Sequence, residues 1–215
     1  MIKKTAAYCL FLFLACVVAQ AQVFEPVTNQ PVQSLSAYLQ VSEDKNNSIT
    51  IEQLLSDQHP LAFHSFARIE KPDMRSTWWA KLDILPSFSS EDFYIGLPNQ
   101  ERPGISQGND NADVWIVRDN NIMANYRTGN LVPVSDRPVA RPINHNLFPV
   151  SLKEKQPITI YWRISRSVNF EPLQFSFALQ HGSVIHSVSS PGDKLAWFYT
   201  GVMLIIFFFG LVFYL

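Results

Sequence analysis

Several segments in the middle of the chain carry apolar residues at every second position. This spacing is typical of β-strands, because successive side chains of a strand point to opposite faces of the sheet. It is clearest over residues 78–84, 158–164 and 173–179, and it recurs in shorter form at 93–97 and 114–117. The spacing predicts strands that bury one face each, which is the pattern of antiparallel sheets.

A hairpin and one further strand complete the expected β-structure. The turn-forming run Asp119-Asn120-Asn121 separates two strand-like segments, so residues 113–126 are predicted to form a β-hairpin. A short strand is also expected at 147–152. About seven short strands joined by Pro- and Asn-containing loops predict an all-β fold, an antiparallel β-sandwich of the jelly-roll kind. Strands do not alternate with helices, so a parallel sheet is not expected.

The segment before these strands shows no sustained periodicity. Residues 22–47 are rich in Gln, Ser, Val and Pro, and we expect an N-terminal lead-in with at most one strand. Thr50 and Gln53 have the spacing of a capping box, which predicts a short helix that ends before Pro60. The sandwich is therefore expected to occupy residues 48–180.

The first residues have the features of a secretory signal peptide. Two lysines precede an unbroken apolar run over residues 6–18, and small residues lead to a cleavage site after Ala21. Residues 1–21 are therefore predicted to be removed, with a lipoprotein signal ending at Cys16 as the alternative. Cleavage after Ala21 removes both cysteines of the chain, which excludes disulfides, thiol catalysis and cysteine metal sites from the mature protein.

The last segment, residues 198–215, carries no charged side chain and follows Trp197 directly. At about 1.5 Å per residue it would reach roughly 27 Å, slightly less than a hydrocarbon core of about 30 Å. These features predict a transmembrane helix, with a buried core helix as the alternative. No basic residue follows, so we expect a fragment or truncated product that ends within its first membrane helix. Together with the signal peptide, this predicts a membrane protein whose sandwich lies outside the cytoplasm.

Residues 181–197 are expected to link the sandwich to the membrane. Val184, Ile185 and Val188 recur at helical spacing, so a short amphipathic helix is predicted within this linker. The Pro-Gly pair at 191–192 is expected to end that helix and to transmit torque poorly.

Composition and motifs exclude several classes of function. Basic and acidic residues nearly balance, at 17 against 18, so no nucleic-acid partner is expected. The sequence lacks the GxSxG, P-loop and GxGxxG patterns, and its paired carboxylates lie in predicted loops, which does not suit a glycosidase. Its five histidines do not have the spacing of a metal site. We therefore expect no catalytic residue, no metal and no cofactor.

The order of these motifs resembles the extracellular type-2 domain of the bacterial seven-transmembrane receptors with diverse intracellular signalling modules. The block at residues 128–139, which contains Gly129, Pro133, Ser135 and Arg137-Pro138, is its most specific part. The other matching segments are residues 49–53, 77–82, 112–117, 147–150, 159–164 and 172–173. Lys81, Trp115 and Asn130 depart from the residues that are usual in the family.

The resemblance implies a jelly-roll ectodomain similar to carbohydrate-binding modules, followed by membrane helices and a cytoplasmic output such as a histidine kinase, a diguanylate cyclase or a phosphatase. It also implies a bacterial inner-membrane protein whose ectodomain lies in the periplasm or outside the cell. This fragment itself is then a ligand sensor and not an enzyme. Its expected partners are a carbohydrate or another small ligand, the lipid bilayer, and a second copy that dimerises through the ectodomain or the membrane helices. The alternative is a membrane-tethered periplasmic binding or scaffold domain that does not signal.

Strand alternation also predicts where a ligand would bind. If the apolar positions of segments 78–84 and 158–164 face the core, the intervening aromatic and basic side chains share the opposite face. With two residues from the adjoining loop, the candidate ligand-binding residues are Trp79, Lys81, Asp136, Arg137, Tyr161 and Arg163. The alternative is that Arg137 and Arg163 hold loops by hydrogen bonds and that Trp79 merely covers the sheet. A bulge would exchange the two faces.

Overall fold

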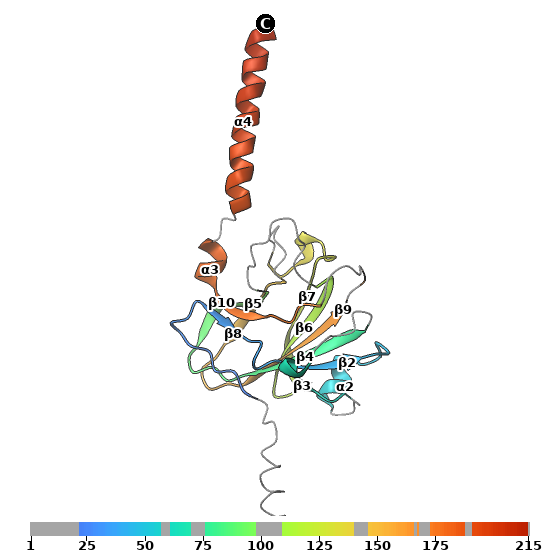
Figure 1. The fold of residues 1–215 in the computed structure, drawn as a ribbon. Coiled ribbons are helices and arrows are strands. Elements are labelled where there is room, and N and C mark those ends of the chain that lie inside the picture. Colours follow the sequence, from blue (N-terminus) through green and yellow to red (C-terminus); the bar gives the residue numbers. More distant parts are fainter. Residues whose placement is uncertain are drawn as a thin grey trace, which may run out of the picture.

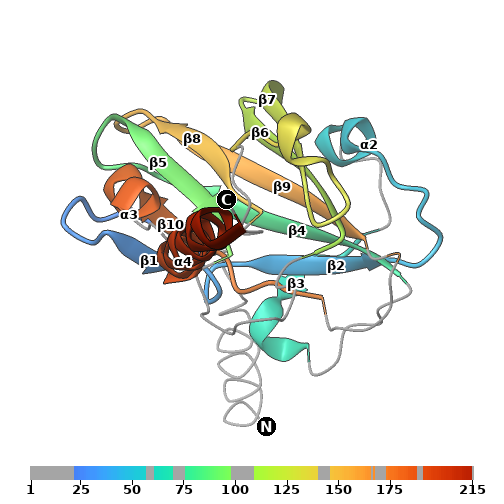
Figure 2. The ribbon, with the colours of Figure 1, turned by 90° about the horizontal axis from the view of Figure 1, so that it is seen from above.

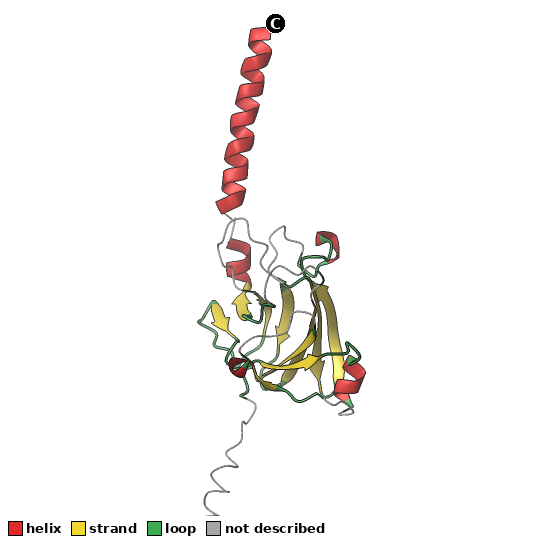
Figure 3. Cartoon of the chain, turned by 45° about the vertical axis from the view of Figure 1, so that its right-hand side comes forward, coloured by secondary structure: helices red, strands yellow, loops and turns green. Residues whose placement is uncertain are grey.

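The structure is a computed structural model that describes residues 22–56, 61–69, 76–97, 109–139, 146–165, 167, 173–187 and 191–214. The predicted signal peptide lies outside these residues. The described part consists mainly of two antiparallel sheets that pack face to face, with a few short helices around them and one long helix leaving the sandwich (Figures 1 and 3). The predicted all-β antiparallel sandwich is therefore confirmed at this level.

The larger sheet has six strands in the order β3-β2-β4-β9-β6-β7. Every pairing within it is antiparallel. Its strands are β2 (Gln40–Asp44), β3 (His64–Ser65), β4 (Thr77–Ile84), β6 (Asn111–Arg118), β7 (Asn121–Thr128) and β9 (Ile158–Ser165).

The smaller sheet has four strands in the order β1-β10-β5-β8, again antiparallel. Its strands are β1 (Val32–Ser34), β5 (Ser90–Gly96), β8 (Phe148–Leu152) and β10 (Ala178–His181). Pro149 lies in β8, at the edge of this sheet, where the missing backbone N–H of proline interrupts no interior ladder.

The main core fills the space between the two sheets. Its aromatic centre is Trp162, which stacks on Phe177 with ring centroids 5.0 Å apart and contacts the edge of Phe148. Tyr126 of β7 stacks on Phe148 of β8, so edge strands of the two sheets meet on that side. The alternate apolar residues of β4 and β9 belong to this core, as the sequence predicted.

The predicted hairpin is formed by β6 and β7. Asp119 and Asn120, the two residues between the strands, both have positive φ, 49° and 58°. Such values suit a two-residue turn of type I′, for which Asn and Asp are favoured because their short side chains tolerate this backbone. The turn signal in the sequence was therefore sufficient to place this hairpin.

Two predictions about strands were wrong. Residues 22–47 contain two strands, β1 and β2, whereas at most one was expected. The predicted strand at 173–179 is reduced to β10, which begins at Ala178. Residues 173–177 still bury alternate apolar side chains, but the Asn109 side chain takes the place of a strand partner and bonds the backbone of Gln174 in both directions, each at 2.9 Å.

Short helices lie around the sandwich. The helix predicted after Thr50 is α2 (Ile51–Leu55), and two 3-10 turns follow, η1 (Phe66–Arg68) and η2 (Val134–Asp136). The short helix expected in the linker is α3 (Gly182–Ser187), which continues directly from β10.

The long helix α4 (Pro191–Tyr214) begins at the proline that was expected only to break the linker. Proline is favoured in the first turn of a helix, because the backbone N–H that it lacks has no partner there. Within the described residues, no helix combines the length and the hydropathy that crossing a membrane demands. The transmembrane helix predicted over residues 198–215 is therefore not confirmed. Figure 2 views the molecule along the direction in which α4 leaves the sandwich.

Leu35 tests whether the segment before residue 48 belongs to the folded core. It is fully buried in the main core, so Leu35→Ala is expected to lower the free energy of unfolding by about 2–5 kcal/mol. Leu131, which is 52% exposed, provides the control, and Leu131→Ala is expected to change it by less than about 0.5 kcal/mol. Urea denaturation measures both, and equal effects of the two variants would show that residues 22–47 are dispensable for folding.

Candidate functional site

The outer face of the six-stranded sheet, opposite the main core, carries four of the six predicted site residues. The register of β4 and β9 pairs Trp79 with Arg163 and Lys81 with Tyr161. Their neighbours along both strands, such as Trp78 and Trp162, point into the main core. The structure therefore brings these four side chains together on one face, as the alternation predicted.

Helix α2 covers part of this face. Trp79 is fully buried in a second apolar cluster with Ile49, Ile51 and Leu54, separate from the main core. It is thus not accessible to a ligand, although the sequence suggested that it would be. Alternation shows which face a side chain occupies, but it does not show that a helix packs over that face.

Local hydrogen bonds place α2 on the sheet. The buried carboxylate of Asp44 accepts bonds from the backbone N–H groups of Ser48 and Ile49, at 3.2 and 2.9 Å. Thr50 and Gln53 then form the predicted capping box, since each side chain accepts from the other residue's backbone N–H. A hydrogen bond to the Thr50 side chain lowers the pKa of the exposed carboxyl of Glu52.

Two half-buried aromatic side chains lie beside the covered tryptophan. Trp115 of β6 stacks on Trp79 with ring centroids 5.3 Å apart, and the register pairs Trp115 with Tyr161. Phe63 contacts Tyr161 edge to face at 6.4 Å. Trp115 was not among the predicted site residues, although its place between the inward Val114 and Ile116 indicated an outward side chain.

Charged groups on the same face are already paired with one another. Lys81 Nζ lies 3.2 Å from Asp83 Oδ2, with both side chains about one-quarter exposed. Arg127 Nε lies 3.8 Å from Asp113 Oδ1 nearer the edge of the sheet. Thr159 donates a 2.6 Å hydrogen bond to the other oxygen of Asp83, so a compact polar cluster borders Tyr161.

Arg163 holds the loop that leads into α2. Its Nη2 donates a 2.5 Å hydrogen bond to Oδ1 of Asn47, which also accepts from Thr77 Oγ1 at 2.9 Å. Asn47 has a φ of +52°, in the left-handed region that asparagine tolerates better than most residues. This contact favours a structural role for Arg163.

The remaining predicted residues, Asp136 and Arg137, lie in the loop that follows β7. Arg137 donates from Nε to the carbonyl of Val132 at 2.9 Å and from Nη2 to the carbonyl of Asn130 at 3.4 Å. Partial burial lowers the pKa of Arg137, but a guanidinium remains charged at neutral pH. Asp136 is exposed and accepts a hydrogen bond from Ser135. Arg137 therefore braces its own loop, and neither residue lies on β4 or β9.

The described residues contain no group of three or more His, Cys, Asp or Glu side chains arranged to hold a metal ion. Aromatic rings beside paired charges suit reversible binding of a polar ligand with apolar faces.

Comparison with known proteins decides the family. The profile of the family described as 7TMR-DISM extracellular 2 matches residues 36–180, more than half of the chain. The chain belongs to this family. The match extends from just before β2 to the third residue of β10, so it includes α2, the outer face of the six-stranded sheet and the loop braced by Arg137.

One curated protein is also similar, the transcription initiation factor TFIID subunit 2 of Drosophila melanogaster, with 24% identity over 135 residues. The similar region covers 60% of this chain and 11% of that protein. Because the similarity is confined to so small a part of that protein, it gives no information about the function of this 7TMR-DISM extracellular 2 domain.

The role of Arg163 can be tested by stability. Arg163→Ala removes the bond to Asn47 and is expected to lower the free energy of unfolding by about 1 kcal/mol. Arg127→Ala is the matched control, because the Arg127 side chain is 70% exposed and its ion pair is worth less than about 0.5 kcal/mol. Thermal and urea unfolding measure both variants. A stability loss no larger for Arg163→Ala than for Arg127→Ala would contradict the structural role.

Gly129 tests the packing of the loop after β7. An added Cβ would lie 2.3 Å from the carbonyl oxygen of Asp110, and the φ of +133° is unfavourable for other residues. Gly129→Ala is therefore expected to lower the free energy of unfolding by about 1–3 kcal/mol or more. Gly201→Ala in α4 is the control, because nothing lies within 4 Å of its added Cβ. Similar melting temperatures for the two variants would show that the loop rearranges around the added Cβ at little cost in stability.

Proposed function

We propose that this chain is the extracytoplasmic sensor domain of a bacterial membrane signal-transduction receptor. Its membership of the 7TMR-DISM extracellular 2 family supports this role, because that family comprises extracellular domains of such receptors. The sensor binds its ligand in the periplasm, and a cytoplasmic output module beyond this chain converts binding into a signal. The chain itself acts by binding and not by catalysis.

The proposed ligand site is the partly exposed area of the outer face next to α2. The observation that carries this proposal is the pairing of two half-buried aromatic residues, Trp115 and Tyr161, beside the Lys81–Asp83 ion pair. Adjacent strands lie about 4.8 Å apart, so neighbouring rings and charges on this face are spaced on the scale of a single sugar ring.

The proposed ligand is a carbohydrate or a related small molecule. Aromatic rings stack on the apolar faces of sugars, while ammonium and carboxylate groups bond to hydroxyl groups. Lys81 and Asp83 together offer a donor and an acceptor for hydroxyl groups without a large net charge. Of the six ligand-binding residues predicted from the sequence, Lys81 and Tyr161 remain in the proposed site, and Trp115 and Asp83 are added to it. A jelly-roll module similar to carbohydrate-binding modules remains our interpretation of the sandwich.

The packing at the end of β10 offers a route by which the state of the sandwich reaches the linker. His181 Nε2 lies 3.7 Å from Asp92 Oδ2, and the His181 ring contacts the edge of Phe93. An added Cβ on Gly182, the first residue of α3, would lie 1.8 Å from Asp92 Oδ1. Helix α3 is therefore packed closely against β5, so a conformational change in the smaller sheet would shift the helix directly. We propose the lipid bilayer and a second copy of the chain as further partners of the receptor.

Glycan titration tests the ligand site. The full chain in detergent is titrated with neutral and acidic glycan fragments while tryptophan fluorescence is recorded, since Trp115 lies at the proposed site. Tyr161→Ala is expected to weaken binding about tenfold, which corresponds to about 1.4 kcal/mol. Tyr199→Ala is the matched control, because Tyr199 lies on α4 and is 60% exposed.

Unchanged affinity in a folded Tyr161→Ala variant would contradict the proposed site, because the ligand would then bind elsewhere. Absence of binding to any glycan would contradict the proposed class of ligand. Equal weakening by Tyr199→Ala would indicate a general effect of the detergent-bound chain.

A further inference from the structure

The loop that follows β7, residues 129–137, is held rigidly although it lies at the surface; we name it the η2 loop. The backbone N–H groups of Asn130 and Leu131 donate to the carbonyls of Asn109 and Asp110, at 2.8 and 3.0 Å. From the other side, Arg137 bonds the carbonyls of Val132 and Asn130. These bonds brace the loop at both ends.

The η2 loop nevertheless exposes apolar side chains at its tip. Val132 is buried at 5% exposure, whereas Leu131 is 52% exposed and Val134 is 42% exposed. The backbone of Leu131 is held by its bond to Asp110, and the carbonyl of Val134 accepts a bond from the backbone N–H of Arg137 at 3.4 Å. A rigid loop with an apolar tip exposes its side chains to water at a free-energy cost that a contact would remove.

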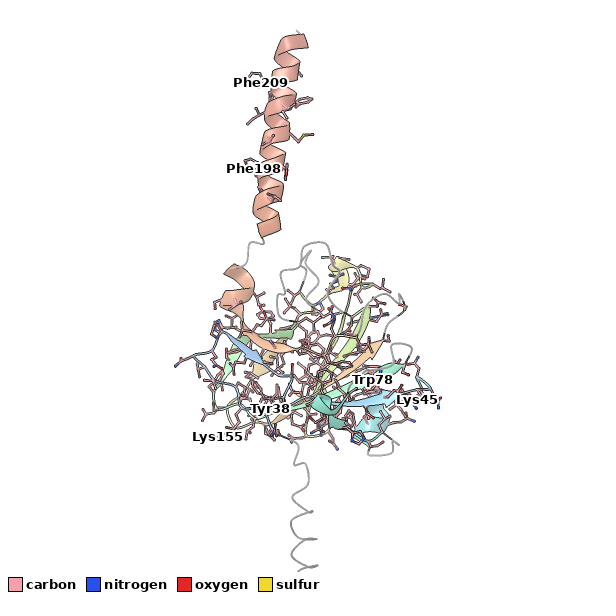
Figure 4. The ribbon with its side chains drawn as sticks, viewed as in Figure 1. Tyr38, Lys45, Trp78, Lys155, Phe198 and Phe209 are labelled. Carbon is pink, nitrogen blue, oxygen red and sulfur yellow. The ribbon has the colours of Figure 1, made fainter. Side chains whose placement is uncertain are left out.

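The place of the η2 loop on the molecule indicates what it contacts. The loop lies at the end of the sandwich from which α3 and α4 leave (Figures 1 and 3). Lys155 lies at the opposite end (Figure 4). Helix α4 also exposes large apolar side chains, among them Trp197 at 78%, Phe198 at 65% and Phe209 at 62%. The apolar side chains exposed by the η2 loop and by α4 therefore lie toward the same end of the molecule, while others, such as Val27, Leu85 and Met123, are exposed outside these two elements.

Building on the membrane-receptor role proposed above, we propose that the η2 loop contacts the surface of a lipid bilayer through Leu131 and Val134. The chain belongs to a family of extracellular domains of membrane receptors, so a bilayer lies near the domain. Two isolated apolar side chains on a protruding loop suit a fluid apolar layer, whereas a protein partner would require a complementary pocket. Arg127 precedes the loop on β7 and its side chain is 70% exposed, and basic side chains close to a membrane surface are attracted to anionic lipids.

The contact would give the sandwich a second point of attachment besides the linker. A domain attached through its linker alone could tilt relative to the membrane. With the η2 loop resting on the bilayer, the orientation of the six-stranded sheet becomes fixed, and a shift of the β6–β7 hairpin would alter that contact.

A fluorescent label on the loop tests the proposal. Ser135→Cys, in a chain with Cys9→Ser and Cys16→Ser, is labelled with the environment-sensitive dye NBD, and the full chain is reconstituted into phosphatidylcholine–phosphatidylglycerol vesicles. We expect NBD emission to shift to shorter wavelength and to be quenched by nitroxide-labelled lipid. Gln156→Cys, exposed at the opposite end of the sandwich near Lys155, is the control and should show neither effect.

A second variant separates loop insertion from general attachment of the chain. Leu131→Ser with Val134→Ser removes the apolar tip while the bracing bonds remain, so the label at position 135 should lose its shift although the chain stays on the vesicles. Emission in the unaltered loop that matches the Gln156 control would overturn the proposal. A shift without lipid quenching would also overturn it, since it would show that a protein surface covers the loop.

Discussion

The rest of the structure depends on the central strands β4 and β9, whose inner faces are fully buried and whose outer face is buried where α2 covers it. On the inner face, Trp78 and Trp162 belong to the main core; on the outer face, Trp79 lies beneath α2. Each buried indole removes a large apolar area from water and contributes several kcal/mol of stability. Helix α2 is therefore an integral part of the domain. Beside it on the outer face, Trp115 and Tyr161 are half-buried and stay partly accessible.

Hydrogen bonds from polar side chains hold the segments that lie outside the paired strands. Asn109 replaces a strand partner for Gln174, and Arg137 braces the η2 loop. Asn47 accepts hydrogen bonds from Thr77 and Arg163. Buried backbone groups require such partners, because an unsatisfied group costs about 1–3 kcal/mol. Two of the residues first considered as ligand contacts are thus more easily understood as parts of the framework. That framework positions the proposed site next to them.

The β6–β7 hairpin connects the two surfaces for which we propose roles. Trp115 lies on β6 in the proposed ligand site, and β7 leads directly into the η2 loop at the end from which α4 leaves. A ligand that shifts Trp115 would therefore act on the same hairpin that carries the proposed membrane contact. In a receptor, this arrangement would convert ligand binding into a change in the orientation of the domain, in addition to any change transmitted through α3.

The sequence by itself determined the phase of β4 and β9, the hairpin turn at Asp119-Asn120 and the capping box of α2. Each follows from contacts between residues close in the chain, or from the period of two that any strand imposes. Only the tertiary structure decided that α2 covers Trp79, that Arg163 bonds Asn47, and that β1 and β2 join the sheets. These outcomes depend on contacts between segments distant in sequence. Alternation specifies which side chains share a face, but the element that covers a face is selected by packing across the whole domain.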